Sequence, residues 1–144
     1  MRAVLQRVLT ASVAVDGKVI GGIEDAGLLV LLGVTHHDGR PEVEWMARKI
    51  WELRLLREEM SASEVGAPIL VVSQFTLYGE ARKGRRPTWA AAAPGSISGP
   101  LYEQVCAELE RLGATVARGA FGADMQVSLV NDGPVTLVLD TPQR

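Results

Sequence analysis

The residues best suited to chemistry in this sequence interrupt the apolar stretch PILVVSQFTLYG, residues 68–79. Ser73, Gln74 and Thr76 place two hydroxyls and one amide in a run that is otherwise largely aliphatic or aromatic. Buried polar groups need hydrogen-bond partners, so these side chains either find them in the core or line a cleft. Thr76 acts as a nucleophile only if a general base lies beside it, and the sequence indicates no such base.

A second unusual stretch is NDGPVT, residues 131–136, which joins Gly133 to Pro134 between two apolar runs. Asn-Asp-Gly alone is typical of a tight hairpin turn. Pro134 has no N–H for a strand ladder, and Gly133 has no Cβ to keep other groups away from the main chain. The residues leave two interpretations open: an ordinary turn before an edge strand, or a backbone surface that contacts a ligand.

The segment RKGRRP, residues 82–87, carries four cations in six residues. Such a segment is either an exposed turn or a flexible loop that follows the phosphates of an RNA backbone. It has no interleaved aromatic residues, so it is not a platform for base stacking.

Other familiar chemistries find little support in the sequence. His36, His37 and Asp38 have no second ligand cluster at zinc-like spacing, so we expect a solvated loop. Cys106 lies beside Val105 on the apolar face of a predicted helix, so we expect a buried thiol. The sequence has no G-x-S-x-G motif, no P-loop and no G-x-G-x-x-G fingerprint after a strand.

Composition limits the class of protein. The chain has 144 residues, of which 47% are hydrophobic, a formal net charge of −2 and one cysteine. We therefore expect one domain over residues 1–144 that does not coat nucleic acid non-specifically and has no internal disulfide. No signal peptide is evident, and no apolar run approaches the ~20 residues that span a bilayer. These features predict a soluble, cytoplasmic protein.

The spacing of apolar residues predicts the elements that position these groups. In chain order they are a hairpin turning at Asp16-Gly17, a strand over 27–34, a helix over 41–56, a strand over 68–79, a loop over 89–100, a helix over 99–113, and strands over 125–129 and 135–140 joined by a turn at 131–134. This order predicts an α+β domain with a mixed or antiparallel sheet, or a barrel-like β core, and two main helices.

Five stretches of the chain together resemble the D-aminoacyl-tRNA deacylase family: residues 6–17, 27–34, 71–77, 84–89 and 123–136. The similarity runs in order over nearly the whole chain, and the motifs SQFT and NxGPVT are specific as a pair. The resemblance implies a homodimeric cytoplasmic enzyme that hydrolyses the ester between a D-amino acid and the terminal adenosine of tRNA. It also implies activity on glycyl-tRNA and the use of no metal and no organic cofactor. DNA and membranes are not among the expected partners.

The resemblance assigns roles by motif. Gly133-Pro134 is similar to a Gly-cisPro pair that enters the active site of the partner subunit and rejects L-amino acids. The pocket-lining residues that the resemblance implies are Ser73, Gln74, Phe75, Thr76 and Met125. Thr76 matches a threonine proposed as nucleophile, whereas a later view assigns water activation to the 2′-hydroxyl of the tRNA. We adopt the later view, because no basic residue is evident beside Thr76.

The segment 54–68 departs from the family pattern, because it is shorter and has Leu56 in place of an aromatic residue. We expect the core pocket to survive this change. Backbone N–H groups of residues 74–76 are the expected oxyanion donors. Two alternatives stay open: a non-catalytic RNA-binding module that uses the basic loop, and a metal-free esterase for small amino-acid esters.

Overall fold

The N-terminal strand organises the sheet in this computed structural model, which describes residues 1–143. Strand β1 (Arg2–Val15) pairs along one side with β3 (Gly27–Gly33) and then with β2 (Lys18–Ile23). Its other side pairs over almost its whole length with β6 (Gln126–Asp140). All three pairings are antiparallel.

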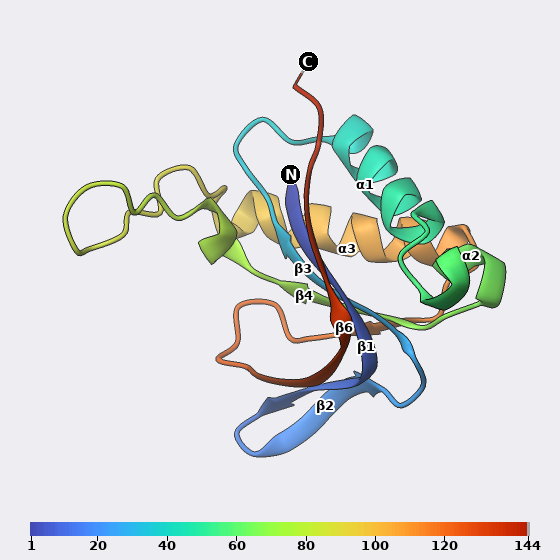
Figure 1. Cartoon of the computed structure of the whole chain (residues 1–144). Helices are drawn as coiled ribbons and strands as arrows, with labels where there is room; N and C mark the ends of the chain where they lie inside the picture. The colour runs from blue at the N-terminus through green and yellow to red at the C-terminus, as the bar shows by residue number, and fades with distance from the viewer. Residues whose placement is uncertain (144) are drawn as a thin grey trace.

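The sheet continues in parallel from β3 to β4 (Ile69–Ser73) and β5 (Val116–Arg118). Its two ends curl toward each other until β2 and β5 touch. Gly21 of β2 lies so close to β5 that an added Cβ would overlap the carbonyl oxygen of Arg118. The mixed sheet is therefore barrel-like and nearly closed, as predicted. Figure 1 shows the curled sheet with the helices gathered on one of its faces.

Two main helices, α1 (Arg40–Glu52) and α3 (Gly95–Arg111), cover that face, together with the single turn α2 (Ala62–Val65). Residues at odd and even positions of β3 and β4 enter different cores. Leu28 and Val71 pack toward the helices, whereas Leu29 and Leu70 pack inside the curled sheet. Both strands are thus buried on both faces, which explains their continuous apolar runs.

The hairpin at Asp16-Gly17 and the strand at 27–34 are confirmed, while other boundaries differ from the prediction. Helix α1 ends at Glu52, four residues early, because Leu53 adopts an extended backbone. Helix α3 begins at Gly95 inside the predicted loop. The weak helix formers there are held by a local bond, in which the hydroxyl of buried Ser98 donates to the carbonyl of Pro94 at 3.1 Å, and by packing beside the Phe121 ring, which lies 3.7 Å and 3.4 Å from the Cβ positions of Gly95 and Gly99.

The predicted strand over 68–79 is wrong beyond Ser73, and so is the predicted hairpin turn at 131–134. The chain leaves β4 at Gln74 and forms the 3₁₀ helix η2 (Phe75–Tyr78). Strand β6 runs without reversal through residues 126–140. Both differences from the prediction lie in motifs that interrupt apolar runs. In these motifs polar residues, glycine and proline break the residue pattern that strands normally follow.

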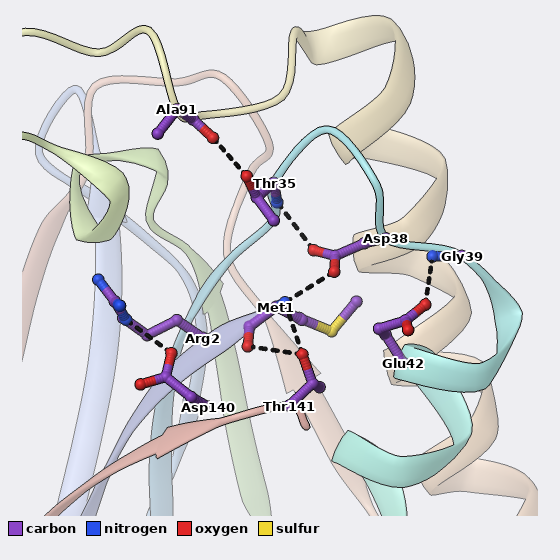
Figure 2. Close-up of polar contacts among 9 residues, drawn as sticks. All are labelled: Met1, Arg2, Thr35, Asp38, Gly39, Glu42, Ala91, Asp140 and Thr141. Atoms are coloured by element: carbon purple, nitrogen blue, oxygen red, sulfur yellow. Dashed lines mark hydrogen bonds and ion pairs between the residues drawn. The ribbon is translucent and has the colours of Figure 1, made fainter. Parts of the chain in front are cut away.

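The N-terminus is tied to the loop before α1 (Figure 2). The ammonium of Met1 donates to Asp38 at 2.7 Å and to the Thr141 hydroxyl at 2.9 Å. The second carboxylate oxygen of Asp38 accepts the Thr35 N–H at 2.8 Å, and the Thr35 hydroxyl donates to the carbonyl of Ala91 at 2.6 Å. The prediction of a solvated loop at 36–38 is therefore wrong for Asp38, whose side chain is 5% exposed.

Candidate active site

A cavity of about 560 Å³ opens where the end of β4 meets the start of α3 and the segment before β6. It brings together Ser73, Gln74 and Phe75 with Met125, which lies about fifty residues later in the sequence. Most of the remaining wall is apolar, including Leu32, Val34, Val72, Ala93, Phe121 and Val127. The structure thus gathers four of the seven predicted site residues around one cavity.

The floor of the cavity is set by the way β4 ends. The N–H of Gln74 donates to the carbonyl of Leu32 at 2.7 Å, which is the last bond that ties this segment to β3. Helix η2 then folds back over β3, and a Cβ at Gly33 would lie only 3.1 Å from the carbonyl oxygen of Gln74. Arg2 holds the far end of η2 by donating to the carbonyl of Leu77 at 3.0 Å.

This geometry changes the expected set of oxyanion donors. Because the N–H of Gln74 is already bonded to Leu32, it is not free for a substrate. The N–H groups of Phe75 and Thr76 begin a 3₁₀ helix, so the helix itself supplies no acceptor for them. Two of the three predicted donors therefore remain without a partner in the helix: that of Phe75, which lines the cavity, and that of Thr76, which follows it outside the lining.

Thr76 lies outside the cavity lining, and its side chain is exposed. Its hydroxyl is hydrogen-bonded to the side-chain amide of Gln74. An amide does not remove a proton from a hydroxyl at neutral pH, so this contact does not activate Thr76 as a nucleophile.

Two exposed aromatic residues stand at the mouth of the cavity. Phe75 is 53% exposed and Trp89 is 44% exposed, and their rings meet edge to face with centroids 5.5 Å apart. A third ring, Phe121, lines the cavity and lies 6.1 Å from the ring of buried Tyr102. No pattern in the sequence singles out Trp89 or Phe121, although both stand in or next to stretches that carry the family resemblance.

Met125 forms part of the wall because residue 119 is glycine. A Cβ at Gly119 would lie 2.8 Å from the sulfur of Met125 and 3.8 Å from methyl carbons of Val13 and Val72. Only the first of these distances is too short for an atomic contact. The position of the methionine therefore depends on the missing side chain at Gly119.

Gly133 and Pro134 do not line this cavity. They bulge from β6: Thr136 faces Gln6 and Asn131 faces Val8, so residues 132–135 are not paired with residues of β1 in the sheet. The bond between them is cis, both residues are exposed, and a Cβ on Gly133 would overlap the backbone nitrogen of Val135. We refer to residues 132–135 as the β6 bulge.

Side chains on either flank hold the β6 bulge. Arg7 donates to the carbonyl of Asp132 at 2.7 Å, and the Asn131 amide donates to the carbonyls of Arg7 at 2.9 Å and Val135 at 3.2 Å. Arg57 donates to the Asp132 carboxylate at 2.6 Å, which holds the pKa of that carboxyl below its usual value. The bulge is therefore a fixed, outward-facing surface.

The basic segment forms a loop that projects away from the body of the molecule (Figure 1). Its base is closed by two backbone hydrogen bonds between Glu80 and Thr88, each 2.9 Å long. The four cations that it carries are exposed: Arg82, Lys83, Arg85 and Arg86. Arg82 lies 3.6 Å from Glu80.

Within residues 1–143 the structure offers neither a metal-binding cluster nor a membrane-spanning helix. No three histidine, cysteine, aspartate or glutamate side chains gather there into a possible metal site. Cys106 is fully buried, as predicted, and burial raises the pKa of its thiol to about 11. No helix of this part of the chain combines the length and apolar character needed to cross a membrane.

Comparisons with a family model and with curated relatives both point to tRNA deacylases. A family model described as D-Tyr-tRNA(Tyr) deacylase matches residues 4–140. A D-aminoacyl-tRNA deacylase of Thermobifida fusca is 63% identical over 140 residues, which cover 97% of this chain and 99% of that protein. One from Streptomyces coelicolor is 59% identical with the same coverage.

Two solved structures share the fold. A protein named c-Myc DNA Unwinding Element Binding Protein matches with a TM-score of 0.93 and 39% identity, covering 99% of this chain and 100% of that one. A probable eukaryotic D-amino acid tRNA deacylase matches with a TM-score of 0.84 over 97% of this chain and 98% of that one. At 17% identity, the second likeness concerns the fold alone.

Proposed function

Because the chain belongs to the D-Tyr-tRNA(Tyr) deacylase family, we propose that it hydrolyses the ester of D-aminoacyl-tRNA and of glycyl-tRNA. The products are the free amino acid and tRNA. The observation that carries the proposal is the gathering of Ser73, Gln74, Phe75 and Met125 around one cavity. Its volume of about 560 Å³ lies within the ~300–1,000 Å³ typical of small-ligand sites.

The chemistry relies on backbone groups. Hydrolysis turns the ester carbonyl into a tetrahedral oxyanion, and the N–H groups of Phe75 and Thr76 are the donors that this chain offers to it. The loss of one such donor typically costs ~10²–10³ in rate. The vicinal 2′-hydroxyl of the ribose lies next to the ester in every substrate, so it can activate water without a protein base. This assignment fits the bonding of the Thr76 hydroxyl to an amide.

The β6 bulge completes the site of a second copy in this proposal. Gly133 and Pro134 are exposed and lie outside the cavity of their own chain, so any action on substrate requires another subunit. In the residues described, β6 pairs only with β1, and Val130 and Val138 are 51% and 60% exposed. An unpaired edge strand with exposed apolar residues favours association with another chain. The proposed assembly is a homodimer.

Discrimination between D- and L-amino acids follows from exclusion by main chain. With the ammonium and the ester both held, the α-carbon directs its hydrogen and its side chain to two different sides. A backbone wall on the L side collides with every L side chain, whereas glycine and D residues pass. Such a wall needs no recognition of individual side chains. Gly133 and Pro134 supply a suitable surface, because neither presents a polar side chain.

The projecting loop is the proposed contact with tRNA. Its four exposed cations suit phosphates, and it ends immediately before Trp89 at the mouth of the cavity. A protein that acts on charged tRNA belongs in the cytoplasm, which is the location that we propose. The name of one solved relative refers to a DNA element, so duplex DNA is the appropriate competitor in a binding assay.

A deacylation assay tests the proposed function. D-tyrosyl-tRNA, L-tyrosyl-tRNA and free D-tyrosine ethyl ester are each incubated with the purified protein in the presence of EDTA. The proposal predicts turnover of D-tyrosyl-tRNA and little of the other two. Binding of tRNA without turnover would instead indicate an RNA-binding module, and equal turnover of the free ester would indicate a general esterase.

A further inference from the structure

Arg57 reaches the β6 bulge from a different part of the chain. It begins the short 3₁₀ helix η1 (Arg57–Glu59), in the segment 54–68 that departs from the family pattern. Its guanidinium donates twice to Asp132, at 2.6 Å and 3.4 Å. Because Asp132 immediately precedes Gly133, the guanidinium of Arg57 binds the β6 bulge one residue away from the exposed Gly133-Pro134 pair.

Asp132 is held on two sides. Its carbonyl accepts from Arg7 of β1 at 2.7 Å, and its carboxylate accepts from Arg57. Arg7 also donates to the carbonyl of Leu55 at 3.4 Å, so both arginines join the bulge to the same segment. The Asp132 side chain is only 14% exposed, although the Arg57 side chain is 68% exposed.

Arg57 begins a turn whose backbone conformation is constrained. Glu58 and Glu59 both have positive φ, at 61° and 57°, which is uncommon for consecutive non-glycine residues. The turn is closed by the N–H of Leu56, which donates to the carbonyl of Met60 at 2.9 Å. Arg57 is therefore carried on a constrained turn and not on a free loop.

We propose that Arg57 is a positioning residue for the β6 bulge and thereby sets the discrimination between D- and L-aminoacyl-tRNA. The inference rests on the proposed function, in which Gly133 and Pro134 form the wall that excludes L side chains. Residues 132–135 have no ladder bonds to β1, so contacts at their flanks fix where that wall stands. A shift of about 1 Å in such a wall alters rates by up to ~10²-fold.

The alternative is an ordinary surface ion pair, which contributes little to stability. The two readings differ in what they predict for Arg57→Met. An ordinary pair leaves both the thermal midpoint and the substrate preference unchanged. A positioning residue leaves the midpoint nearly unchanged but lowers the ratio of D- to L-tyrosyl-tRNA turnover.

The test compares the wild type with Arg57→Met, Arg57→Lys and the matched control Arg54→Met. Arg54 lies on the same segment, is 72% exposed and faces Glu64 at 3.6 Å instead of Asp132. Single-turnover rates are measured with D- and L-tyrosyl-tRNA. We expect the D/L ratio to fall by about 10- to 100-fold in Arg57→Met, to recover in part in Arg57→Lys and to stay unchanged in Arg54→Met.

NMR order parameters of the backbone amides of Gly133 and Val135 provide a readout that needs no activity. We expect Arg57→Met to lower them from the ~0.85 typical of rigid backbone toward the values below ~0.6 typical of flexible backbone, and Arg54→Met to leave them unchanged. Unchanged order parameters together with an unchanged D/L ratio would overturn the inference. Lower order parameters in a protein that never hydrolyses D-tyrosyl-tRNA would support the anchoring of the bulge by Arg57 while refuting the proposed function.

Discussion

Gly119→Ala tests the cavity wall with the smallest possible change. The added Cβ lies 2.8 Å from the sulfur of Met125, whereas non-bonded contacts of this kind are optimal near ~3.5–4.0 Å. The sulfur must therefore move by about 1 Å, and the cavity is the open space beside it. Methionine adapts readily, so we expect a stability loss near the lower end of the ~1–3 kcal/mol typical of overpacking.

Activity responds more strongly than stability in this prediction. A displacement of about 1 Å in a substrate-positioning wall costs up to ~10²-fold, so we expect kcat/KM for D-tyrosyl-tRNA to fall about 10- to 100-fold. The assay pairs single-turnover deacylation with thermal unfolding of each variant. Gly99→Ala is the control, because its Cβ meets the Phe121 ring at an ordinary 3.4 Å.

A second variant identifies the cause. In a Met125→Ala background the sulfur is absent, so Gly119→Ala has nothing to displace and its additional effect disappears. Equal activity of Gly119→Ala and the wild type would refute the reasoning. A loss that persists in full in the Met125→Ala background would refute it as well, since the displaced group would then not be Met125.

Three further predictions concern other parts of the chain. Thr76→Ala retains most of the deacylation rate, and a trappable acyl-enzyme in the wild type would contradict this expectation. Neutralising Arg82, Lys83, Arg85 and Arg86 together lowers the slope of log affinity for tRNA against log salt, each contact contributing ~0.7–0.9 units; an unchanged slope would show that the loop does not touch phosphate. Burial raises the pKa of Cys106 from 9.0 to about 11 in the folded state, so its contribution to stability is complete below pH 9 and lost as the pH rises toward 11. Between pH 9 and pH 11 the free energy of unfolding, measured by chemical denaturation, should therefore fall by about 2 kcal/mol less in Cys106→Ala than in the wild type. Equal falls in the two proteins would contradict the raised pKa.

The sequence predicted the parts of the fold that depend on periodicity. The continuous apolar run at 27–34 and the Asp16-Gly17 turn each have one common structural solution, and both are present. Helical spacing located α1 and α3, but the start of α3 at Gly95 was missed. Residues with poor helix propensity begin that helix because its first turns pack against the pocket side of the sheet.

The site was predicted less completely because it depends on long-range geometry. The motif SQFT was placed in a strand, yet its polar residues mark the point where β4 turns into η2. The motif NDGPVT was given a local turn, yet β1 supports a bulge there through Arg7, and Asn131 ties the two strands together. The role of Arg57 depends on contacts between residues 75 positions apart, which no local pattern reveals.

The most direct test of the account asks whether one active site needs two chains. Phe75→Asp places a carboxylate at the cavity, and Pro134→Asp places one on the β6 bulge; each homodimer should lose most of its activity against an anionic substrate. Mixing and refolding the two variants in equal amounts makes half of the dimers mixed, and each mixed dimer has one intact cavity facing one intact bulge. The account predicts recovery of about one quarter of the wild-type rate on D-tyrosyl-tRNA. Mixed dimers that form, as shown by native mass spectrometry, but stay as inactive as the separate variants would contradict it.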